Sequence, residues 1–128
     1  MASNARNRVA STLTTVLGGG IVAVGVGYLS GASSVTSGFG VAGWDRVDPA
    51  AYRVKGIRDV ASGIAPLLLL LTRQRRALGW VLLVESLVPI GDMVTVLRHG
   101  GTPAVAVGIH GTTAAAVLTT SALLLTES

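Results

Sequence analysis

Three apolar stretches of the chain contain side chains that can carry charge. Drawn as a helix, residues 51–72 place Lys55, Arg58 and Asp59 on one face, and Ser62 continues that face. Ionisable side chains at the centre of a membrane-spanning helix cost about 2.5 to 3.5 kcal/mol each by insertion scales, so they usually face the protein interior and pair. These four residues therefore predict a polar site between helices.

The next two apolar stretches, 77–97 and 103–125, contribute further polar groups. Glu85 and Asp92 lie seven positions apart, which places them on the same side of a helix. His110 lies about 10 Å from the start of the last stretch, at the depth of Asp92. We expect the three stretches to direct these side chains into one pocket.

The polar set contains two cations and three acids. Lys55 and Arg58 suffice to keep two carboxylates ionised, whereas desolvation favours the protonated form of a third carboxyl that has no cation beside it. Glu85 is the deepest acid and the furthest from the cations, so we expect it to hold that proton. The expected catalytic residues are Asp59, Glu85 and Asp92, and the expected substrate-binding residues are Lys55, Arg58, Ser62 and His110.

Acid–base catalysis is the chemistry that this set favours. A protonated Glu85 would donate a proton to a substrate, while an ionised carboxylate, Asp92 or Asp59, would remove one elsewhere. The apolar surroundings indicate a lipophilic small molecule. Isomerisation, cyclisation and epoxide opening fit, and none of them needs a cofactor. The expectation is an enzyme of the isomerase, cyclase or hydrolase type.

Two other functions fit the same residues. Buried ion pairs between Arg58 and the carboxylates of Asp59 or Asp92 would fix helix register in a structural accessory subunit. A small proton-coupled transporter acting as a dimer has a similar length and number of spans. Small multidrug transporters carry a membrane Glu in their first helix, however, and this chain has none there. No metal site is expected, because the acids and His110 lack a diagnostic ligand spacing.

The composition indicates an integral membrane protein. Of 128 residues, 50% are hydrophobic and 12% are charged, against about 25% charged in soluble proteins. Spans are expected at 12–30, 51–72, 77–97 and 103–125, with a Gly/Ser-rich loop at 31–50. The second stretch reaches the roughly 20 residues of a crossing only when its charged residues are included. The predicted fold is a single all-α domain, a bundle of four transmembrane helices.

The distribution of basic residues predicts the topology. The N-terminus and the segment 73–76 together contain five Arg, whereas the loops 31–50 and 98–102 with the start of the second span contain three. The positive-inside rule then places both termini in the cytoplasm. The protein itself is expected in the cell membrane. The N-terminal apolar run is expected to be retained as a helix rather than removed as a signal peptide. The net charge of +4 is explained by these flanking residues, and nucleic acid is not an expected partner.

Small residues recur at helical spacing in the first and last stretches. Such stripes let helix backbones approach closely within a membrane. They predict either tight packing inside one chain or a homodimer interface. The two stripes are Gly19, Ala23, Gly27 and Gly31, and Ala104, Gly108, Thr112 and Ala116.

Two short motifs carry a family resemblance. "KGIRD", residues 55–59, and "LVPIGDM", residues 87–93, together with the four-span layout over 13–125, resemble a family of small four-helix membrane proteins from bacteria and fungi that is known as a domain of unknown function. The family is loosely similar to the DoxX-like membrane proteins. The resemblance implies the fold and a functional role around Lys55, Arg58, Asp59 and Asp92. It implies no particular activity or substrate.

Overall fold

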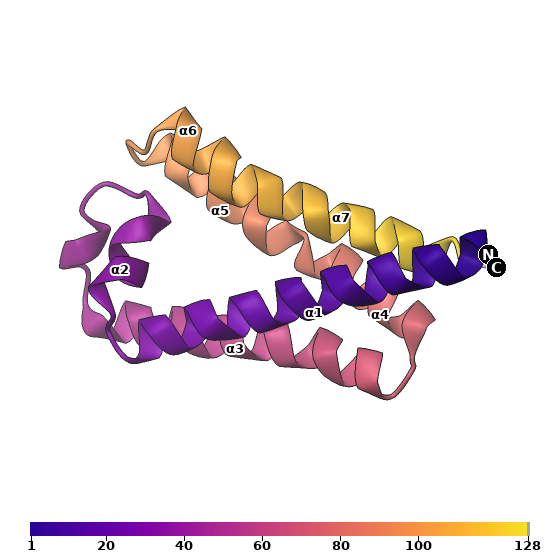
Figure 1. Ribbon diagram of the computed structural model, residues 1–128. Coiled ribbons are helices and arrows are strands. Elements are labelled where there is room, and N and C mark those ends of the chain that lie inside the picture. The colour runs from indigo at the N-terminus through magenta and orange to yellow at the C-terminus, as the bar shows by residue number, and fades with distance from the viewer. Residues whose placement is uncertain (128) are drawn as a thin grey trace.

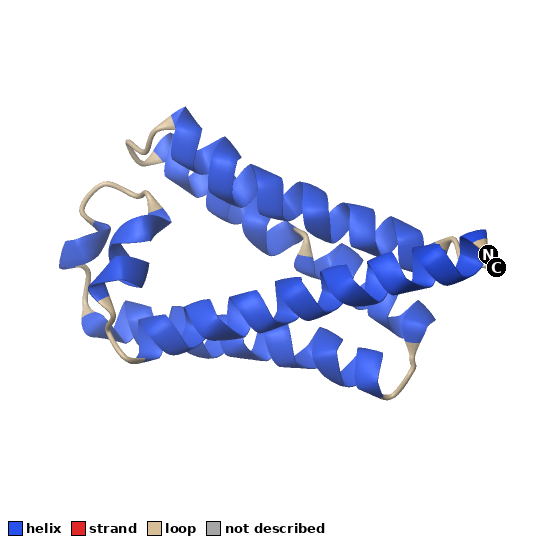
Figure 2. Cartoon of the chain, in the orientation of Figure 1, coloured by secondary structure: helices blue, strands red, loops and turns tan. Residues whose placement is uncertain are grey.

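The computed structural model describes residues 1–127, and every regular element in that range is helical (Figure 2). The predicted all-α class is therefore confirmed. The long helices are α1 (Ala2–Leu29), α3 (Pro49–Leu71), α4 (Arg75–Glu85), α5 (Leu87–Arg98) and α7 (Thr112–Leu125). Short helices complete the chain: α2 (Ser33–Thr36), η1 (Ser37–Phe39), η2 (Trp44–Arg46), α6 (Pro103–Val105) and η3 (Ala106–Gly111).

Three helical segments are long and apolar enough to cross a membrane. They are Ser3–Leu29, Arg75–Arg98 and Pro103–Leu125, and they identify the chain as a membrane protein. The remaining expected span corresponds to α3, which has 23 residues, or about 35 Å of helix. Its length is sufficient, but its charged residues make it less apolar than the other three.

Local sequence signals set the start of α3 and of the last helix. The Asp48 carboxylate accepts a hydrogen bond from the backbone N–H of Ala50 at 2.8 Å, and Pro49 occupies the first helical turn. The Thr102 hydroxyl similarly accepts from the N–H of Val105 at 3.3 Å. Capping therefore agrees with the stretch boundaries expected from hydropathy.

The third expected span is interrupted at Ser86, where α4 ends and α5 begins. Pro89 has no N–H to donate to the carbonyl of Glu85, so the helical ladder loses a bond at this point. The Ser86 hydroxyl donates to the carbonyl of Leu83 at 2.6 Å, within the preceding turn. The break thus separates the turn that carries Glu85 from the turns that carry Asp92.

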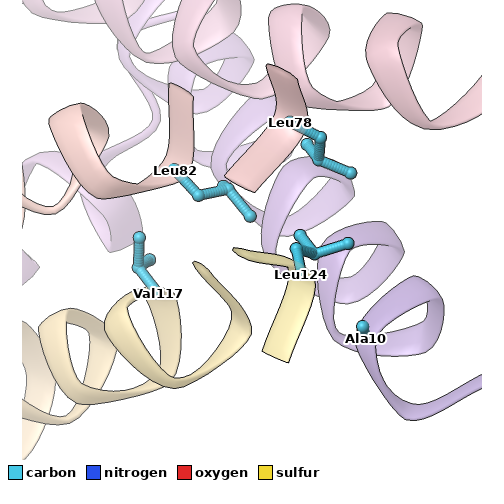
Figure 3. Packing of buried hydrophobic residues seen from close by; sticks show 5 residues of the cluster. All are labelled: Ala10, Leu78, Leu82, Val117 and Leu124. Carbon is cyan, nitrogen blue, oxygen red and sulfur yellow. The ribbon is translucent and has the colours of Figure 1, made fainter. Parts of the chain in front are cut away.

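The helices form two antiparallel pairs that meet at one end and diverge at the other (Figure 1). α1 packs along α3, while α4 and α5 pack along α7 and η3. Where the pairs meet, a small apolar core joins α1, α4 and α7 (Figure 3). We call this the closed end; its core residues are Ala10, Leu78, Leu82, Val117 and Leu124.

Glycines bring α1 and α3 into backbone contact. A Cβ added to Gly63 would lie 2.5 Å from the carbonyl oxygen of Gly18, and one added to Gly25 would lie 2.7 Å from that of Gly56. A methyl group at either position would clash with backbone. Of the stripe expected in α1, Gly19 makes no such contact, because nothing lies within 4 Å of a Cβ added there, whereas Gly27 packs closely against Val35.

In the last helix, most residues of the predicted stripe make no close packing contact within the chain. A Cβ added to Gly108 would meet no atom within 4 Å, and Ala104 and Thr112 are exposed. The turn of η3 explains the shift, because a π-helix places more residues in each turn than an α-helix. The homodimer stays a prediction.

The loop 31–50 folds across the diverging end of the two pairs (Figure 1). Its short helix α2 lies next to α1, with η1 beside α2, and Val35 packs at the position of Gly27. The backbone of Gly40 has a positive φ of 94°, which turns the chain toward Val105 at the start of the last helix. The loop therefore covers the opening between the pairs.

At the closed end, Arg75 links three segments. Its guanidinium donates two hydrogen bonds of 2.6 Å to the carboxylate of Glu127, one of 3.0 Å to the hydroxyl of Ser11, and one of 3.3 Å to the carbonyl of Asn7. Both chain ends therefore lie on the same side of the bundle, as Figure 1 also shows.

Candidate functional site

Four charged side chains from α3 and α5 meet between the helix pairs. Lys55 Nζ lies 2.9 Å from Asp59 Oδ2 and 3.8 Å from Asp92 Oδ2. Arg58 reaches the same two carboxylates at 3.3 and 3.7 Å. We call Lys55, Arg58, Asp59 and Asp92 the charge cluster. The sequence prediction that acids from the second and third stretches come together is confirmed by these contacts.

The two carboxylates of the charge cluster differ in accessibility. The side chain of Asp59 is 1% exposed and lies between both cations, whereas that of Asp92 is 17% exposed. Two ion pairs hold the Asp59 carboxylate in place. Asp92 is therefore the carboxylate of the cluster that a ligand can reach.

Aromatic rings enclose Lys55 on its other side. Its Nζ lies 5.0 Å from the ring centroid of Tyr28 and 4.9 Å from that of Phe39. Cations at this distance from a ring are attracted by its negative face. Phe39 in turn packs against Trp44, with ring centroids 4.7 Å apart. The sequence analysis did not identify these rings as part of the site.

A cavity of about 370 Å³ lies between the helix pairs, beneath the loop 31–50. Its volume falls in the usual range for small-molecule sites. Leu17, Leu82 and Val117 line its inner part toward the closed end. The polar residues in its wall are Ser34, Lys55, Asp59, Ser62, Glu85, Asp92, His110 and Thr113. Six of the seven predicted site residues therefore border one space.

Arg58 is the predicted site residue that does not line the cavity. Its side chain is 44% exposed, and its guanidinium approaches the carboxylates of Asp59 and Asp92 from outside. Long basic side chains near a helix end direct their charge toward the membrane surface in this way. Arg58 thus contacts both carboxylates of the cluster, and its predicted substrate-binding role stays a prediction.

Glu85 lies on the cavity wall without an ionic partner. Among residues 1–127, no hydrogen bond or ion pair involves its side chain, and the same holds for the hydroxyl of Ser62. Glu85 lies two turns from Asp92, toward the apolar inner part. The expectation that Glu85 is the acid furthest from the cations agrees with this position.

His110 connects the last helix to the covering loop. It belongs to the π-helix η3, and its Nε2 lies 3.0 Å from the carbonyl oxygen of Phe39. The two rings also meet edge to face, with centroids 5.2 Å apart. With Nε2 engaged as the donor, His110 positions the loop, although it also lines the cavity. The sequence contained no signal for the π-turn.

The arrangement combines an ion-paired carboxylate with a separate acid in an apolar space. The cluster supplies two positive and two negative charges, so Asp92 is compensated while its oxygens stay within reach of the cavity. Glu85 has no such compensation, and its surroundings include Leu82 and Val88. Two carboxyl groups in unlike surroundings are what proton donation and proton acceptance on one substrate require.

A family model matches most of the chain. The model described as domain of unknown function DUF4267 matches residues 18–124. The chain belongs to this family. The match includes the whole charge cluster, Glu85 and His110. No curated protein and no solved structure matches the chain. The resemblance seen in "KGIRD" and "LVPIGDM" is thus confirmed as membership of an uncharacterised family, and the looser similarity to DoxX-like proteins stays a prediction.

Proposed function

We propose that this DUF4267 protein is a four-span membrane protein that performs acid–base catalysis on a lipophilic small molecule. Isomerisation, cyclisation and epoxide opening are the reactions of this type. The observation that carries the proposal is the pairing of Glu85, which has no ionic partner among residues 1–127, with the ion-paired Asp92 in one cavity. An apolar wall around both groups favours a lipophilic substrate.

The fourth span of the proposal is α3. Its 23 residues extend about 35 Å, which exceeds the roughly 30 Å of a hydrocarbon core. Lys55 and Asp59 are buried within the bundle, so they do not face lipid. Their mutual contact at 2.9 Å lowers the cost of placing them within the membrane. The helix therefore crosses with Lys55 and Asp59 turned inward, while Arg58 reaches toward the membrane surface.

In this proposal, Glu85 and Asp92 have different roles. Glu85 donates a proton to the substrate, and Asp92 removes a proton from another position of the same molecule. After the product leaves, Asp92 releases its proton to water, and Glu85 takes up a proton from water. Lys55, Arg58 and Asp59 hold Asp92 in place and keep its charge balanced.

The proposed topology places both termini in the cytoplasm. Five Arg flank the closed end in the sequence, at 6, 8, 73, 75 and 76. The charge cluster and the cavity then lie in the outer half of the membrane, under the loop 31–50. A lipophilic substrate would enter from the outer leaflet rather than from the cytoplasm.

A structural accessory role is the second candidate. The ion pairs between α3 and α5, at 3.7 and 3.8 Å, are what a fixed helix register needs. That role requires the charge cluster but not Glu85, which makes no contact with it. Substitution of Glu85 therefore separates the two candidates.

The test compares lipophilic extracts of cells that produce the wild type, Glu85→Gln or Asp92→Asn at equal levels in the membrane. Untargeted mass spectrometry should find a compound consumed or formed with the wild type, and both substitutions should reduce that change by about 100-fold or more. Asp45→Asn is the matched control, because Asp45 is an exposed carboxylate in η2 that does not line the cavity and forms no ion pair within the described residues. Full conversion by both site variants would show that the proposal is wrong.

A further inference from the structure

We infer that the cavity binds an uncharged amphiphile, with its polar group just below the charge cluster and its hydrocarbon chain directed toward the closed end. This inference rests on the proposed function, because it names the class of molecule on which the site would act. It is carried by the order of polar and apolar groups along the cavity and by the charge balance at its outer end.

Polarity changes along the length of the cavity. Lys55, Asp92 and His110 line its outer part, under Phe39 of the loop. Leu17, Leu82 and Val117 line its inner part. The cavity residues of α1 begin at Leu17 and end at Tyr28, eleven positions apart, which corresponds to about 16 Å along the helix axis. An elongated molecule with one polar end matches this order.

The charge balance disfavours an anionic head group. The two cations of the charge cluster already contact two carboxylates at 2.9 to 3.8 Å. Lys55 is further enclosed by the rings of Tyr28 and Phe39. An anionic head would therefore find no free cation on the cavity wall. The charge of that head group would remain unpaired in a cavity that is shielded from water.

An uncharged head finds hydrogen-bonding groups instead. The Ser62 hydroxyl and the Glu85 carboxyl line the cavity below the charge cluster, and neither forms a side-chain hydrogen bond within the described part of the chain. Asp92 adds an acceptor that is partly open to the cavity. A hydroxyl or carbonyl group can bond to these residues and leave the ion pairs intact.

The test uses three photoreactive probes with the same twelve-carbon chain. Each carries a diazirine at the end of the chain, and the heads are a hydroxyl, a carboxylate and a trimethylammonium group. The full-length protein is labelled in lipid nanodiscs with and without excess dodecanol, and the labelled residues are mapped by mass spectrometry. Labelling does not require turnover, so it is independent of the test of catalysis.

Two tryptophan substitutions on α7 serve as a matched pair. Val117→Trp fills the inner part of the cavity, whereas Leu118→Trp adds the same ring to a neighbouring side chain that is 39% exposed. Thr113→Trp, also on the cavity wall, replaces Val117→Trp if that variant does not fold. Size-exclusion profiles establish which variants are folded.

The expected result is dodecanol-sensitive labelling by the hydroxyl probe at residues around Leu17, Leu82 and Val117. This labelling should be about tenfold stronger than with either charged probe, which corresponds to a difference in binding free energy of about 1.4 kcal/mol. Val117→Trp should abolish it and Leu118→Trp should not. Equal or stronger labelling by a charged probe, or labelling unaffected by the cavity variants, would overturn the inference. Selective labelling by the hydroxyl probe without any effect of Glu85→Gln on lipophilic extracts would instead refute catalysis and leave the ligand class standing.

Discussion

Lys55 Nζ lies 2.9 Å from Asp59 Oδ2, and both residues of this pair on α3 are buried, with Lys55 enclosed by Tyr28 of α1 and Phe39 of the covering loop. Lys55 is the single lysine of the chain, and it also contacts Asp92 on the other helix pair. This ammonium group therefore connects the two halves of the bundle above the cavity. Its neighbours explain how a helix with four charged residues fits into an apolar protein.

Breaking this pair should destabilise the protein strongly. Asp59→Asn leaves the Lys55 ammonium with only the longer contact to Asp92, at 3.8 Å. Removing one partner of a buried ion pair typically costs about 3 to 5 kcal/mol, and we expect the lower part of that range because Asp92 remains. Thermal unfolding in detergent measures the effect, with Asp45→Asn as the exposed control. The double variant Lys55→Met, Asp59→Leu should recover most of the loss. Equal melting temperatures for Asp59→Asn and the control would contradict the buried pair.

The contact between α1 and α3 should be sensitive to a single methyl group. Gly63→Ala places a Cβ 2.5 Å from the carbonyl oxygen of Gly18, so the helices must separate. Overpacking of this kind costs about 1 to 3 kcal/mol. Gly19→Ala is the matched control, because that position is open, and it should be neutral or slightly stabilising. If the two variants melt alike, the close approach of α1 and α3 is wrong.

Arg75 should contribute more to stability than its neighbour Arg76. Arg75 donates four hydrogen bonds that join Glu127, Ser11 and Asn7, whereas Arg76 is exposed. Hydrogen bonds to charged groups contribute about 1.5 to 3 kcal/mol, and partial exposure of this site reduces that figure. We therefore expect Arg75→Ala to lower the unfolding temperature by several degrees more than Arg76→Ala. The reverse order would show that the closed end is not held by this guanidinium.

The absence of cysteine from the sequence makes the proposed topology simple to test. A cysteine introduced by Ser33→Cys lies on the exposed part of the covering loop, and one introduced by Gln74→Cys lies between α3 and α4. A membrane-impermeant maleimide should label the first in intact cells and the second only after the membrane is opened. Labelling of both cysteines in intact cells is incompatible with four spans and cytoplasmic termini.

The sequence predicted the meeting of charges better than it predicted helix packing. Asp59 and Asp92 had to face inward because lipid does not tolerate them, and that single constraint predicted that the charged side chains of α3 and α5 meet. The starts of α3 and of the last helix also coincide with ordinary capping residues, Asp48 and Thr102. These features depend on local chemistry, which a sequence contains directly.

The packing faces of the helices and the local breaks within them were harder to predict from the sequence. Three consecutive glycines at 18–20 offer a small residue on several faces of α1, so periodicity selected Gly19 where the structure uses Gly18. The π-turn at His110 and the covering role of the loop depend on a contact between distant segments, the hydrogen bond from His110 to Phe39. No single stretch of sequence contains that information.

Magic-angle-spinning NMR in lipid bilayers tests the central claim most directly, namely that α3 and α5 bring their charged side chains together inside the membrane. Labelling with ¹⁵Nζ-lysine gives one ammonium signal, from Lys55, and ¹³Cγ-aspartate labels four carboxyls. We predict dipolar coupling of Lys55 Nζ to two of those carboxyls, one of which disappears in Asp92→Asn. A Lys55 signal that couples to no aspartate and exchanges freely with bulk water would contradict the claim.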